Sequence, residues 1–377
     1  MKRVAIFGST GSIGTTTLRI IKENPEVFSA VTLVAGKNVE LLIEQIEEFH
    51  PRHVYIKDER NAKMIKRIFP KLDIYTEKVG LEMISKLEDV DIAVSALVGI
   101  AGLEPTWNML KHSKEVALAN KEVLVTGGQL VMERAKRYGT KLKTVDSEHS
   151  AIMQCLRGEE SNKIAKILLT ASGGPFFDKE ITDDITPMQA LNHPNWKMGP
   201  KVTIDSATMM NKGFEVIEAH HLFGVSEEQI EVVVHRQSLV HSMVQFVDGT
   251  IMANIGPTDM QIPIAYALNY PERLGNKIEP LDLFKIGSLK FEEPDLDKFK
   301  CLKLAYKAIH MGHSAQVVLN AADEIAVQAF LDGAIRFTEI PEMIDWALSN
   351  HVVTKLGTVQ EILELDRTVK NECLNRI

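Results

Sequence analysis

The chain has 377 residues, of which 45% are hydrophobic and 25% are charged, and its formal net charge is −8. This length exceeds that of an ordinary single domain and predicts two or three well-cored domains. The negative balance argues against general nucleic-acid binding, which requires a basic face, so local positive groups must hold any anionic ligand. The sequence has no run of about 20 apolar residues, which is the length that a membrane helix needs.

Two further features favour a cytoplasmic protein. The N-terminal residues enter a strand pattern directly, without the charged and apolar regions of a signal peptide. The three cysteines, Cys155, Cys301 and Cys373, are odd in number and widely spaced. We interpret them as small core side chains of a protein in a reducing compartment.

The first 146 residues alternate apolar strands with amphipathic helices. A strand pattern at 2–7 is followed by a glycine-rich turn and a helical pattern, and a second strand is predicted at 30–35. Further strand candidates follow at 53–57, 73–76, 91–95, 115–118 and 142–145. Near-continuous apolar strands are typical of a parallel sheet covered on both faces. We therefore predict a Rossmann-like, doubly wound nucleotide-binding domain over residues 1–146.

The pattern changes after residue 146. Strands are predicted at 164–170, 230–234, 239–247 and 250–255, and Asp248-Gly249 is a hairpin signal between the last two. The long segment 171–200 is irregular and rich in glycine and proline, which is typical of functional or disordered loops. We predict a central α+β domain with a mostly antiparallel sheet over 147–270.

The remainder of the chain has two parts. Residues 271–297 are rich in proline and acids and predict a linker. Helical patterns follow at 298–311, 315–332, 339–350 and 357–375, and they predict a helical bundle over 298–377.

The glycines Gly8, Gly11 and Gly14 lie between a strand and a helix. Glycine allows a tight turn whose backbone approaches a pyrophosphate at the helix N-terminus. Thr10 and Ser12 add hydroxyl groups to the same turn. The spacing indicates a dinucleotide site, although a purely structural turn also fits it.

The second strand ends at Gly36-Lys37-Asn38, where NAD enzymes usually carry an acid. An acid would repel the 2′-phosphate of NADP, whereas Lys37 would attract it, so we expect NADP(H). An ordinary surface lysine also fits. Asn120-Lys121-Glu122 follows strand 115–118, at the edge where parallel sheets bind ligands; a polar helix start is the alternative.

Asp146 and Glu148 flank Ser147 where the strand 142–145 stops. Carboxylates at a strand end can converge on one ion, and Mg²⁺ and Mn²⁺ prefer such oxygen ligands. Glu215 would be the third protein ligand. Taken singly, each acid also fits a solvated charge or a helix-stabilising residue.

A second cluster surrounds Glu215. Asn211 and Lys212 lie within one helical turn of it, and Ser206 and Ser172 add hydroxyl groups. A cation, an amide and hydroxyls suit a phosphate monoester, although a helix cap at Ser206 also fits.

His193 and Trp196 lie in the irregular segment, within a lid loop that we place at about 186–200. A tryptophan between proline and glycine suggests a lid that closes over substrate, or else an anchor of the loop to the core. His241, on an apolar strand, fits a buried histidine and a pocket wall equally well.

These residues resemble the 1-deoxy-D-xylulose 5-phosphate reductoisomerase family over essentially the whole chain. Seven motifs carry the resemblance in the order of the family: Gly-Ser-Thr-Gly-Ser-Ile-Gly (8–14), Ala-Gly-Lys-Asn (35–38), Ala-Asn-Lys-Glu (119–122), Val-Asp-Ser-Glu-His (145–149), Ala-Ser-Gly-Gly-Pro-Phe (171–176), His-Pro-Asn-Trp-Lys-Met-Gly (193–199) and Asp-Ser-Ala-Thr-Met-Met-Asn-Lys-Gly (205–213).

The resemblance implies a role for each matched residue. NADPH would contact Thr10, Gly11, Ser12, Ile13, Gly36, Lys37, Asn38, Asn120, Glu122 and Gly199. Mg²⁺ or Mn²⁺ would be held by Asp146, Glu148 and Glu215. The substrate phosphate would meet Ser172, Ser206, Asn211 and Lys212. The hydroxyl and carbonyl end would meet Lys121, Ser147 and His193, and Trp196 would cover it. Of these residues the catalytic ones would be Lys121, Asp146, Glu148, His193 and Glu215.

The implied reaction rearranges the carbon skeleton of 1-deoxy-D-xylulose 5-phosphate, by retro-aldol cleavage and re-aldolisation, and then reduces the branched aldehyde with NADPH. The product, 2-C-methyl-D-erythritol 4-phosphate, serves isoprenoid synthesis by the non-mevalonate pathway. The resemblance also implies a homodimer, with the central domain combining catalysis and dimerisation. Gln261 departs from the arginine that is commoner in the family, so the resemblance does not define this part of the pocket wall.

Two other readings remain at this stage. One is a different NADP-dependent oxidoreductase, such as a semialdehyde or homoserine dehydrogenase. The other is a non-catalytic dinucleotide sensor. Both leave the three carboxylates Asp146, Glu148 and Glu215 without a purpose.

Overall fold

A computed structural model describes residues 1–159, 163–196 and 198–377. The chain divides into two compact units. The first comprises residues 1–123, 129–150 and 259–276. The second comprises residues 124–128, 151–258 and 277–377.

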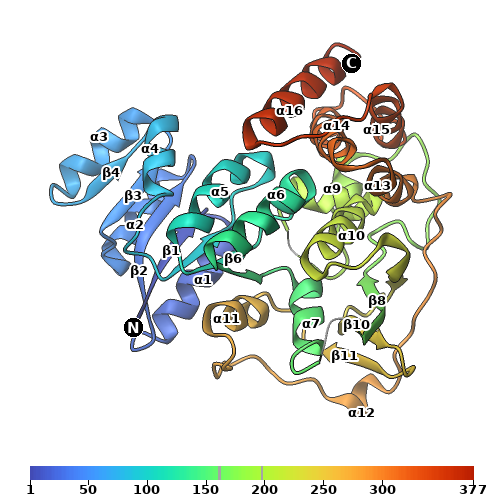
Figure 1. Cartoon of the computed structure of the whole chain (residues 1–377), viewed down its shortest axis with the longest axis horizontal. Coiled ribbons are helices and arrows are strands. Elements are labelled where there is room, and N and C mark those ends of the chain that lie inside the picture. The colour runs from blue at the N-terminus through green and yellow to red at the C-terminus, as the bar shows by residue number, and fades with distance from the viewer. Residues whose placement is uncertain (160–162, 197) are drawn as a thin grey trace. The chain divides into compact units, whose positions relative to one another are not determined.

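The first unit is built on a seven-stranded sheet in the order β4-β3-β2-β1-β5-β6-β7 (Figure 1). All six strand pairs are parallel. The chain reverses its direction of travel across the sheet between β1 and β5, and such a reversal opens a ligand crevice at the carboxyl ends of the strands. The predicted doubly wound fold is confirmed. Its strands are β1 (Lys2–Phe7), β2 (Phe28–Ala35), β3 (His53–Ile56), β4 (Asp73–Tyr75), β5 (Ile92–Ser95), β6 (Glu115–Leu118) and β7 (Lys141–Thr144).

Helices cover this sheet because the strands are apolar on both faces. Along β1, Val4 and Ile6 point to one face and Phe7 to the other, and all three are at most 1% exposed. Burying one such side chain stabilises the fold by about 1.5–3 kcal/mol. Two helices contribute residues to both units, α6 (Glu122–Tyr138) and α7 (Ser147–Cys155). The helices of the first unit alone are α1 (Ser12–Glu23), α2 (Val39–Phe49), α3 (Glu59–Ile68), α4 (Glu77–Ile84), α5 (Leu103–His112) and α11 (Gln261–Asn269).

The turn between β1 and α1 requires glycine for two reasons. Gly8 has a φ of +99°, and a Cβ there would lie 2.5 Å from the carbonyl oxygen of Ala96, which follows β5. A Cβ on Gly14 would lie 2.5 Å from the Cα of Ser9. The turn therefore packs tightly against the loop after β5, and the N-terminus of α1 lies at the switch point of the sheet.

Helix α11 belongs to the first unit, whereas the sequence prediction assigned residues up to 270 to the central region. Ile264 and Leu268 are fully buried in the core of the first unit. Lys2 Nζ donates to the Leu268 carbonyl at 3.0 Å, and Gln261 Nε2 donates to Glu23 at 3.0 Å. The apolar face of α11 packs on α1, and such long-range packing is not visible in local periodicity.

The second unit contains a four-stranded sheet in the order β11-β10-β8-β9. Strand β10 pairs antiparallel with β8 and β11, and the predicted hairpin at Asp248-Gly249 is confirmed. Strands β8 and β9 pair in parallel, and the described part of the long connection between them includes helices that allow this crossover. The strands are β8 (Ile164–Ala171), β9 (Ile230–Val234), β10 (Val240–Phe246) and β11 (Ile251–Ile255), and the crossover helices are α8 (Pro187–Ala190), α9 (Pro200–Thr208) and α10 (Met210–Phe223).

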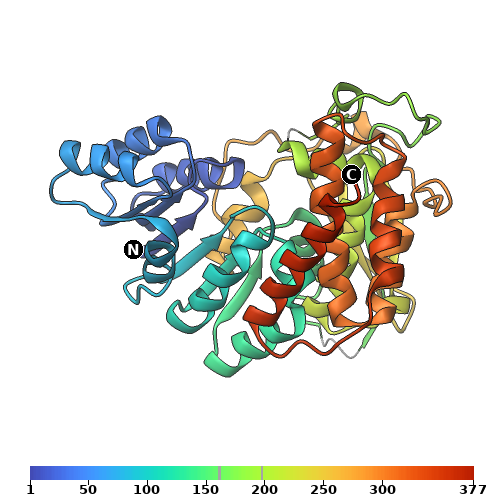
Figure 2. The same ribbon diagram turned by 90° about the horizontal axis from the view of Figure 1, so that it is seen from above.

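Four C-terminal helices lie side by side, as the orange to red ribbons of Figure 2 show. They are α13 (Lys300–Met311), α14 (His313–Leu331), α15 (Glu339–Asn350) and α16 (Val359–Leu374). Helix α14 packs against the other three, and its residues Val318 and Ala322 are fully buried. The predicted helical C-terminal region is confirmed. The segment before it is mostly irregular, with one short helix, α12 (Leu283–Ile286).

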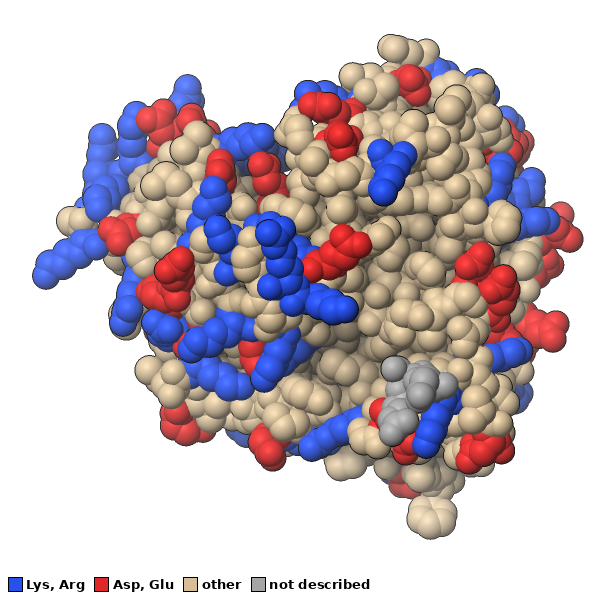
Figure 3. Space-filling view, in the orientation of Figure 1, with Lys and Arg blue, Asp and Glu red and all other residues tan. Residues whose placement is uncertain are grey.

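The described surface carries both acidic and basic side chains, as the composition predicts. On the face drawn in Figure 3, acidic side chains lie among the basic ones. The three cysteines are buried and free. Among the described residues, no helix combines the length and the apolar character that crossing a bilayer needs.

The close contact at Gly14 yields a stability prediction. Gly14→Ala would push its methyl group into the backbone of the β1–α1 turn, and overpacking of this kind costs about 1–3 kcal/mol. We expect a lower melting temperature by circular dichroism. The matched control is Gly36→Ala, since a Cβ at Gly36 meets nothing within 4 Å; equal melting temperatures for both variants would contradict the packing argument.

Candidate active site

The first group of predicted residues surrounds the N-terminus of α1. Gly11 is the N-cap residue, and because it has no side chain it leaves the first N–H groups of the helix uncapped. Ser12 and Ile13 open the helix, where the first backbone N–H groups have no intrahelical acceptor. Gly11 and Ser12 are exposed, and Thr10 and Ile13 are half-buried. Donors and a positive helix end at the switch point of a parallel sheet suit an anionic group.

The carboxyl end of β2 lies beside this turn, since Gly8 and Ser9 both donate to the Val34 carbonyl, at 2.8 and 2.9 Å. Gly36, Lys37 and Asn38 follow and are exposed. Asn38 caps α2, because its Oδ1 accepts from the Leu41 N–H at 3.1 Å. Lys37 therefore offers an exposed cation next to a phosphate-binding type of turn.

Asn120, after β6, has a structural role. Its Nδ2 donates to the Gly99 carbonyl at 2.8 Å and also to the Leu97 carbonyl. Its Oδ1 accepts from the Val123 N–H at 3.1 Å. The side chain is buried and joins the loops after β5 and β6. Glu122, also buried, begins α6.

Asp146, after β7, is the centre of a charged cluster in the first unit. Its Oδ2 lies 2.9 Å from Lys121 Nζ, and its Oδ1 lies 3.1 Å from His149 Nδ1. Oδ1 also accepts from the Glu148 N–H at 3.2 Å. Ser147 Oγ donates to Glu148 Oε2 at 2.6 Å. Neighbouring parallel strands thus bring Lys121, Asp146, Ser147 and Glu148 together at one sheet edge.

Glu215 is the centre of a comparable cluster in the second unit, on α10. Asn211 Nδ2 donates to its Oε1 at 2.6 Å, and Lys212 Nζ pairs with its Oε2. The side chains of Lys212 and Glu215 are only 5% and 2% exposed. Burial of an ionised carboxylate requires such compensation, and the helical spacing of three and four residues provides it.

The turn after β8 approaches the helix that carries Ser206. Gly174 has a φ of +66°, and a Cβ there would lie 2.5 Å from the Ser206 carbonyl oxygen. The absence of a side chain at Gly174 therefore allows the Ser172 turn to lie against α9. This contact places Ser172 and Ser206 in one neighbourhood.

His193 is held in a defined tautomer. Its Nδ1 accepts from the backbone N–H groups of Asn195 at 3.1 Å and Trp196 at 2.9 Å. The proton of the neutral ring is consequently on Nε2, which lies 3.1 Å from Ser172 Oγ and donates to it. The Gly174 N–H donates to the same oxygen at 3.3 Å. Ser172 accepts twice, so its own O–H can donate to a ligand.

Burial lowers the pKa of His193 to about 4, and the positive charge of Arg236 acts in the same direction. His193 is therefore neutral near pH 7. A neutral ring keeps Nδ1 available as an acceptor, so the local conformation of the lid loop depends on this protonation state.

The lid loop ends at Gly199, the N-cap residue of α9. The Gly199 carbonyl accepts from Thr203 Oγ1 at 2.9 Å. Lys201 Nζ lies 2.6 Å from Asp205 and 2.7 Å from Asp323 of α14. The loop is thus fastened at its C-terminal end. Lys197, within the same motif, lies outside the described residues.

Two residues that the sequence left open have defined contacts. His241 Nε2 lies 3.2 Å from the Gly256 carbonyl and 3.3 Å from the Pro257 carbonyl, so it ties β10 to the segment after β11. Gln261 packs within the first unit, as described above. Sequence reasoning missed Asn195 and Arg236, although the position of Arg236 just beyond a strand end was a usable signal.

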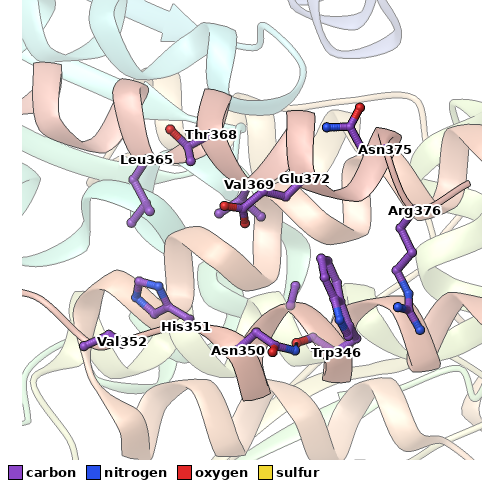
Figure 4. A pocket seen from close by; sticks show the side chains of 11 residues that line it. Trp346, Asn350, His351, Val352, Leu365, Thr368, Val369, Glu372, Asn375 and Arg376 are labelled. Carbon is purple, nitrogen blue, oxygen red and sulfur yellow. Dashed lines mark hydrogen bonds between the residues drawn. The ribbon is translucent and has the colours of Figure 1, made fainter.

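A separate concave surface lies between α15 and α16 (Figure 4). Trp346, His351, Val369 and Arg376 are among the residues that line it. None of the predicted site residues lies there.

The parallel sheet, the glycine turn at its switch point and the charged clusters are typical of dinucleotide-dependent oxidoreductases. Three family models match the chain: "1-deoxy-D-xylulose 5-phosphate reductoisomerase" at residues 4–128, its C-terminal domain at 142–223 and "DXP reductoisomerase C-terminal domain" at 255–372. The chain belongs to the 1-deoxy-D-xylulose 5-phosphate reductoisomerase family.

Relatives of this family match over nearly their full length. The enzyme of Thermoanaerobacter pseudethanolicus is 51% identical over 99% of this chain and 98% of its own, and that of Clostridium perfringens is 49% identical over 98% of each. A solved DOX-P reductoisomerase in complex with NADPH, fosmidomycin and magnesium has a TM-score of 0.95 and 41% identity, covering 100% of this chain and 98% of its own. The Zymomonas mobilis enzyme in complex with NADPH has a TM-score of 0.93 and 36% identity, covering 99% and 98%.

The tautomer of His193 yields a pH prediction. Its folded pKa of about 4 lies below the ordinary 6.5. Its contribution to loop stability is therefore complete above pH 6.5 and is lost as the pH falls through about 4. Protonation of Nδ1 would remove the acceptor of the Asn195 and Trp196 N–H groups. We expect a change in Trp196 fluorescence with a midpoint near pH 4.

The control for this titration is His193→Gln, which should lack the transition, with Trp196→Phe identifying the signal among the three tryptophans. A midpoint near 6.5 in the unaltered protein would contradict the assigned burial of the ring.

Proposed function

We propose that this chain converts 1-deoxy-D-xylulose 5-phosphate to 2-C-methyl-D-erythritol 4-phosphate, with NADPH and a divalent metal ion, in the non-mevalonate route to isoprenoids. The observation that carries the proposal is family membership over the full chain, at 51% identity to a named relative. The clusters around Asp146 and Glu215 supply the chemistry that this reaction needs.

NADPH is the proposed hydride donor. Its pyrophosphate would face the residues of the first turn of α1, Thr10, Gly11, Ser12 and Ile13, where backbone donors and the helix dipole favour an anion. Its 2′-phosphate would meet Lys37, with Gly36 and Asn38 beside it. The remaining contacts would come from Asn120, Glu122 and Gly199.

Mg²⁺ or Mn²⁺ is the proposed metal, held by Asp146, Glu148 and Glu215. The donor set fits, since hard divalent ions take carboxylate oxygens and complete their shell with water and substrate. When bound, the ion would supply Lewis-acid stabilisation of adjacent carbonyl and hydroxyl oxygens. Lys121 and Lys212 pair with two of these carboxylates and would share in binding the substrate.

The substrate phosphate is proposed to bind Ser172, Ser206, Asn211 and Lys212. Three kinds of support converge: the Ser172 hydroxyl can donate, Gly174 brings its turn against α9, and Lys212 brings a buried cation. Binding at this end, remote from the reacting carbons, provides energy for orientation. Lys121, Ser147 and His193 would orient the hydroxyl and carbonyl end, and Trp196 would exclude water above it.

The competing functions receive no comparable support. The matched family models describe reductoisomerase domains along the chain. A dehydrogenase of the homoserine or semialdehyde type, or a dinucleotide sensor, would leave the compensated carboxylates Asp146 and Glu215 unused.

The decisive experiment is NADPH oxidation with 1-deoxy-D-xylulose 5-phosphate in the presence of Mg²⁺ or Mn²⁺, followed by addition of excess chelator. We expect metal-dependent oxidation and a branched tetritol phosphate as product. NADPH binding without any oxidation would overturn the substrate assignment.

A homodimer in the cytoplasm is part of the proposal. Strand β11 is an edge strand whose Ile251, Met252 and Ile255 are 49%, 41% and 46% exposed, and apolar edge strands commonly pair with a partner. A monomer in analytical ultracentrifugation would contradict the dimer.

The buried free cysteines support a reducing compartment, and recovery of the protein outside the cytoplasmic fraction would contradict a cytoplasmic location.

The metal assignment predicts a separation of functions. Asp146→Asn and Glu215→Gln keep the side-chain volume but remove the charge that a divalent ion requires. We expect turnover to fall at least about a thousandfold, since several kcal/mol of stabilisation are lost. NADPH affinity, measured by fluorescence titration, should remain nearly unchanged. Parallel loss of NADPH binding and turnover would count against these metal ligands.

The cofactor assignment predicts a selective loss. Lys37→Ala would remove the cation proposed for the 2′-phosphate, and an exposed contact of this kind is worth about 1 kcal/mol or more. The affinity for NADPH should fall several-fold, and that for NADH should hardly change. Lys57→Ala, at an exposed lysine after β3, is the control; equal loss for both cofactors in Lys37→Ala would exclude the 2′-phosphate contact.

A further inference from the structure

Arg236 follows β9 and makes contacts on two sides. Its Nη1 donates to the carbonyl oxygens of Ser172 at 3.3 Å and Gly174 at 2.9 Å. Its Nη2 lies 3.1 Å from Asp178, and its guanidinium lies 5.3 Å from the ring centre of Phe177. The arginine thus holds both ends of the Ser172–Gly174 turn, and the planar fork of its guanidinium suits this geometry.

The main chain of Arg236 holds the lid loop. Asn195 Nδ2 donates to the Arg236 carbonyl oxygen at 2.8 Å and to Ser238 Oγ at 2.8 Å. His193, two residues earlier, bonds to Asn195 and to Ser172. The contacts therefore form a closed circuit from Ser172 to His193, Asn195, Arg236 and back to Ser172.

The topology explains why one residue can do this. Strands β8 and β9 are parallel, and Ala171 lies opposite Val234 in the register. The turn after β8 and the segment after β9 consequently leave the sheet at the same edge. The lid loop returns to this edge and meets both.

We propose that Arg236 is a positioning residue for substrate binding, which fixes the Ser172 hydroxyl and the His193 ring through this circuit. The inference rests on the proposed function, in which Ser172 and His193 contact the substrate. The positive charge of Arg236, together with burial of the ring, also favours the neutral form of His193. The charge of Arg236 and its hydrogen-bonding fork therefore make separable contributions.

Two variants separate these contributions. Arg236→Gln removes the charge and the fork, and Arg236→Lys keeps the charge but cannot reproduce the fork. We expect both to raise the KM for 1-deoxy-D-xylulose 5-phosphate about tenfold, since charge-assisted hydrogen bonds to the turn are lost. The KM for NADPH should not change. In addition, Arg236→Gln should raise the pKa of His193, whereas Arg236→Lys should leave it near the original value.

The His193 pKa is read from its imidazole NMR resonances, assigned with His193→Gln, and does not depend on activity. Arg376→Gln is the matched control, because Arg376 stacks on Trp346 at 4.8 Å in the same unit (Figure 4); it should alter neither quantity. Melting curves show whether each variant is folded.

An unchanged substrate KM in both variants, or an unchanged His193 pKa in Arg236→Gln, would overturn the proposal. Absence of turnover in the unaltered protein would contradict the proposed function alone, and the His193 titration would still decide the role of Arg236.

Discussion

The candidate active site depends on one constraint: a carboxylate removed from water must be compensated by a cation or by several hydrogen-bond donors. In the clusters around Asp146 and Glu215, a lysine meets this constraint. Lys121 lies 2.9 Å from Asp146 in the first unit, and Lys212 pairs with Glu215 in the second. All four side chains are at most 13% exposed. Each lysine therefore offsets the free-energy cost of removing its partner carboxylate from water.

The two pairs are built by different means. Lys212 and Glu215 are three residues apart on one helix, so the backbone of α10 alone sets their separation. Lys121 and Asp146 are distant in sequence and meet because β6 and β7 are adjacent and parallel. Local geometry forms the first pair, whereas the second requires the folded sheet. Deformation of the sheet edge would consequently affect Asp146 and leave the Glu215 pair intact.

The difference also explains what sequence could predict. Strand positions, the glycine turn, the Asp248-Gly249 hairpin and the C-terminal helices follow from short-range patterns, and the structure confirms them. The attachment of α11 to the first unit and the parallel pairing of β8 with β9 depend on packing between distant segments. Asn120 shows the same limit for the site. Its position at a strand end predicts a ligand contact, but local sequence does not reveal that its side chain also bonds to Leu97, Gly99 and Val123. The predicted site residues remain hypotheses at the level of individual contacts.

The loops of the candidate active site are fixed in two physically distinct ways. At Gly8 and Gly174 the chain omits a side chain, so backbone approaches backbone to a distance that a Cβ would prevent. At His193 and Arg236 it uses side chains whose hydrogen bonds are directional and depend on charge. The first means is insensitive to pH, and the second requires a neutral imidazole and a permanent cation. The proposed lid function would need contacts that can be broken one at a time, and close backbone packing does not provide them. Hydrogen bonds to a neutral histidine can be broken and remade singly, which suits the segment that carries Trp196.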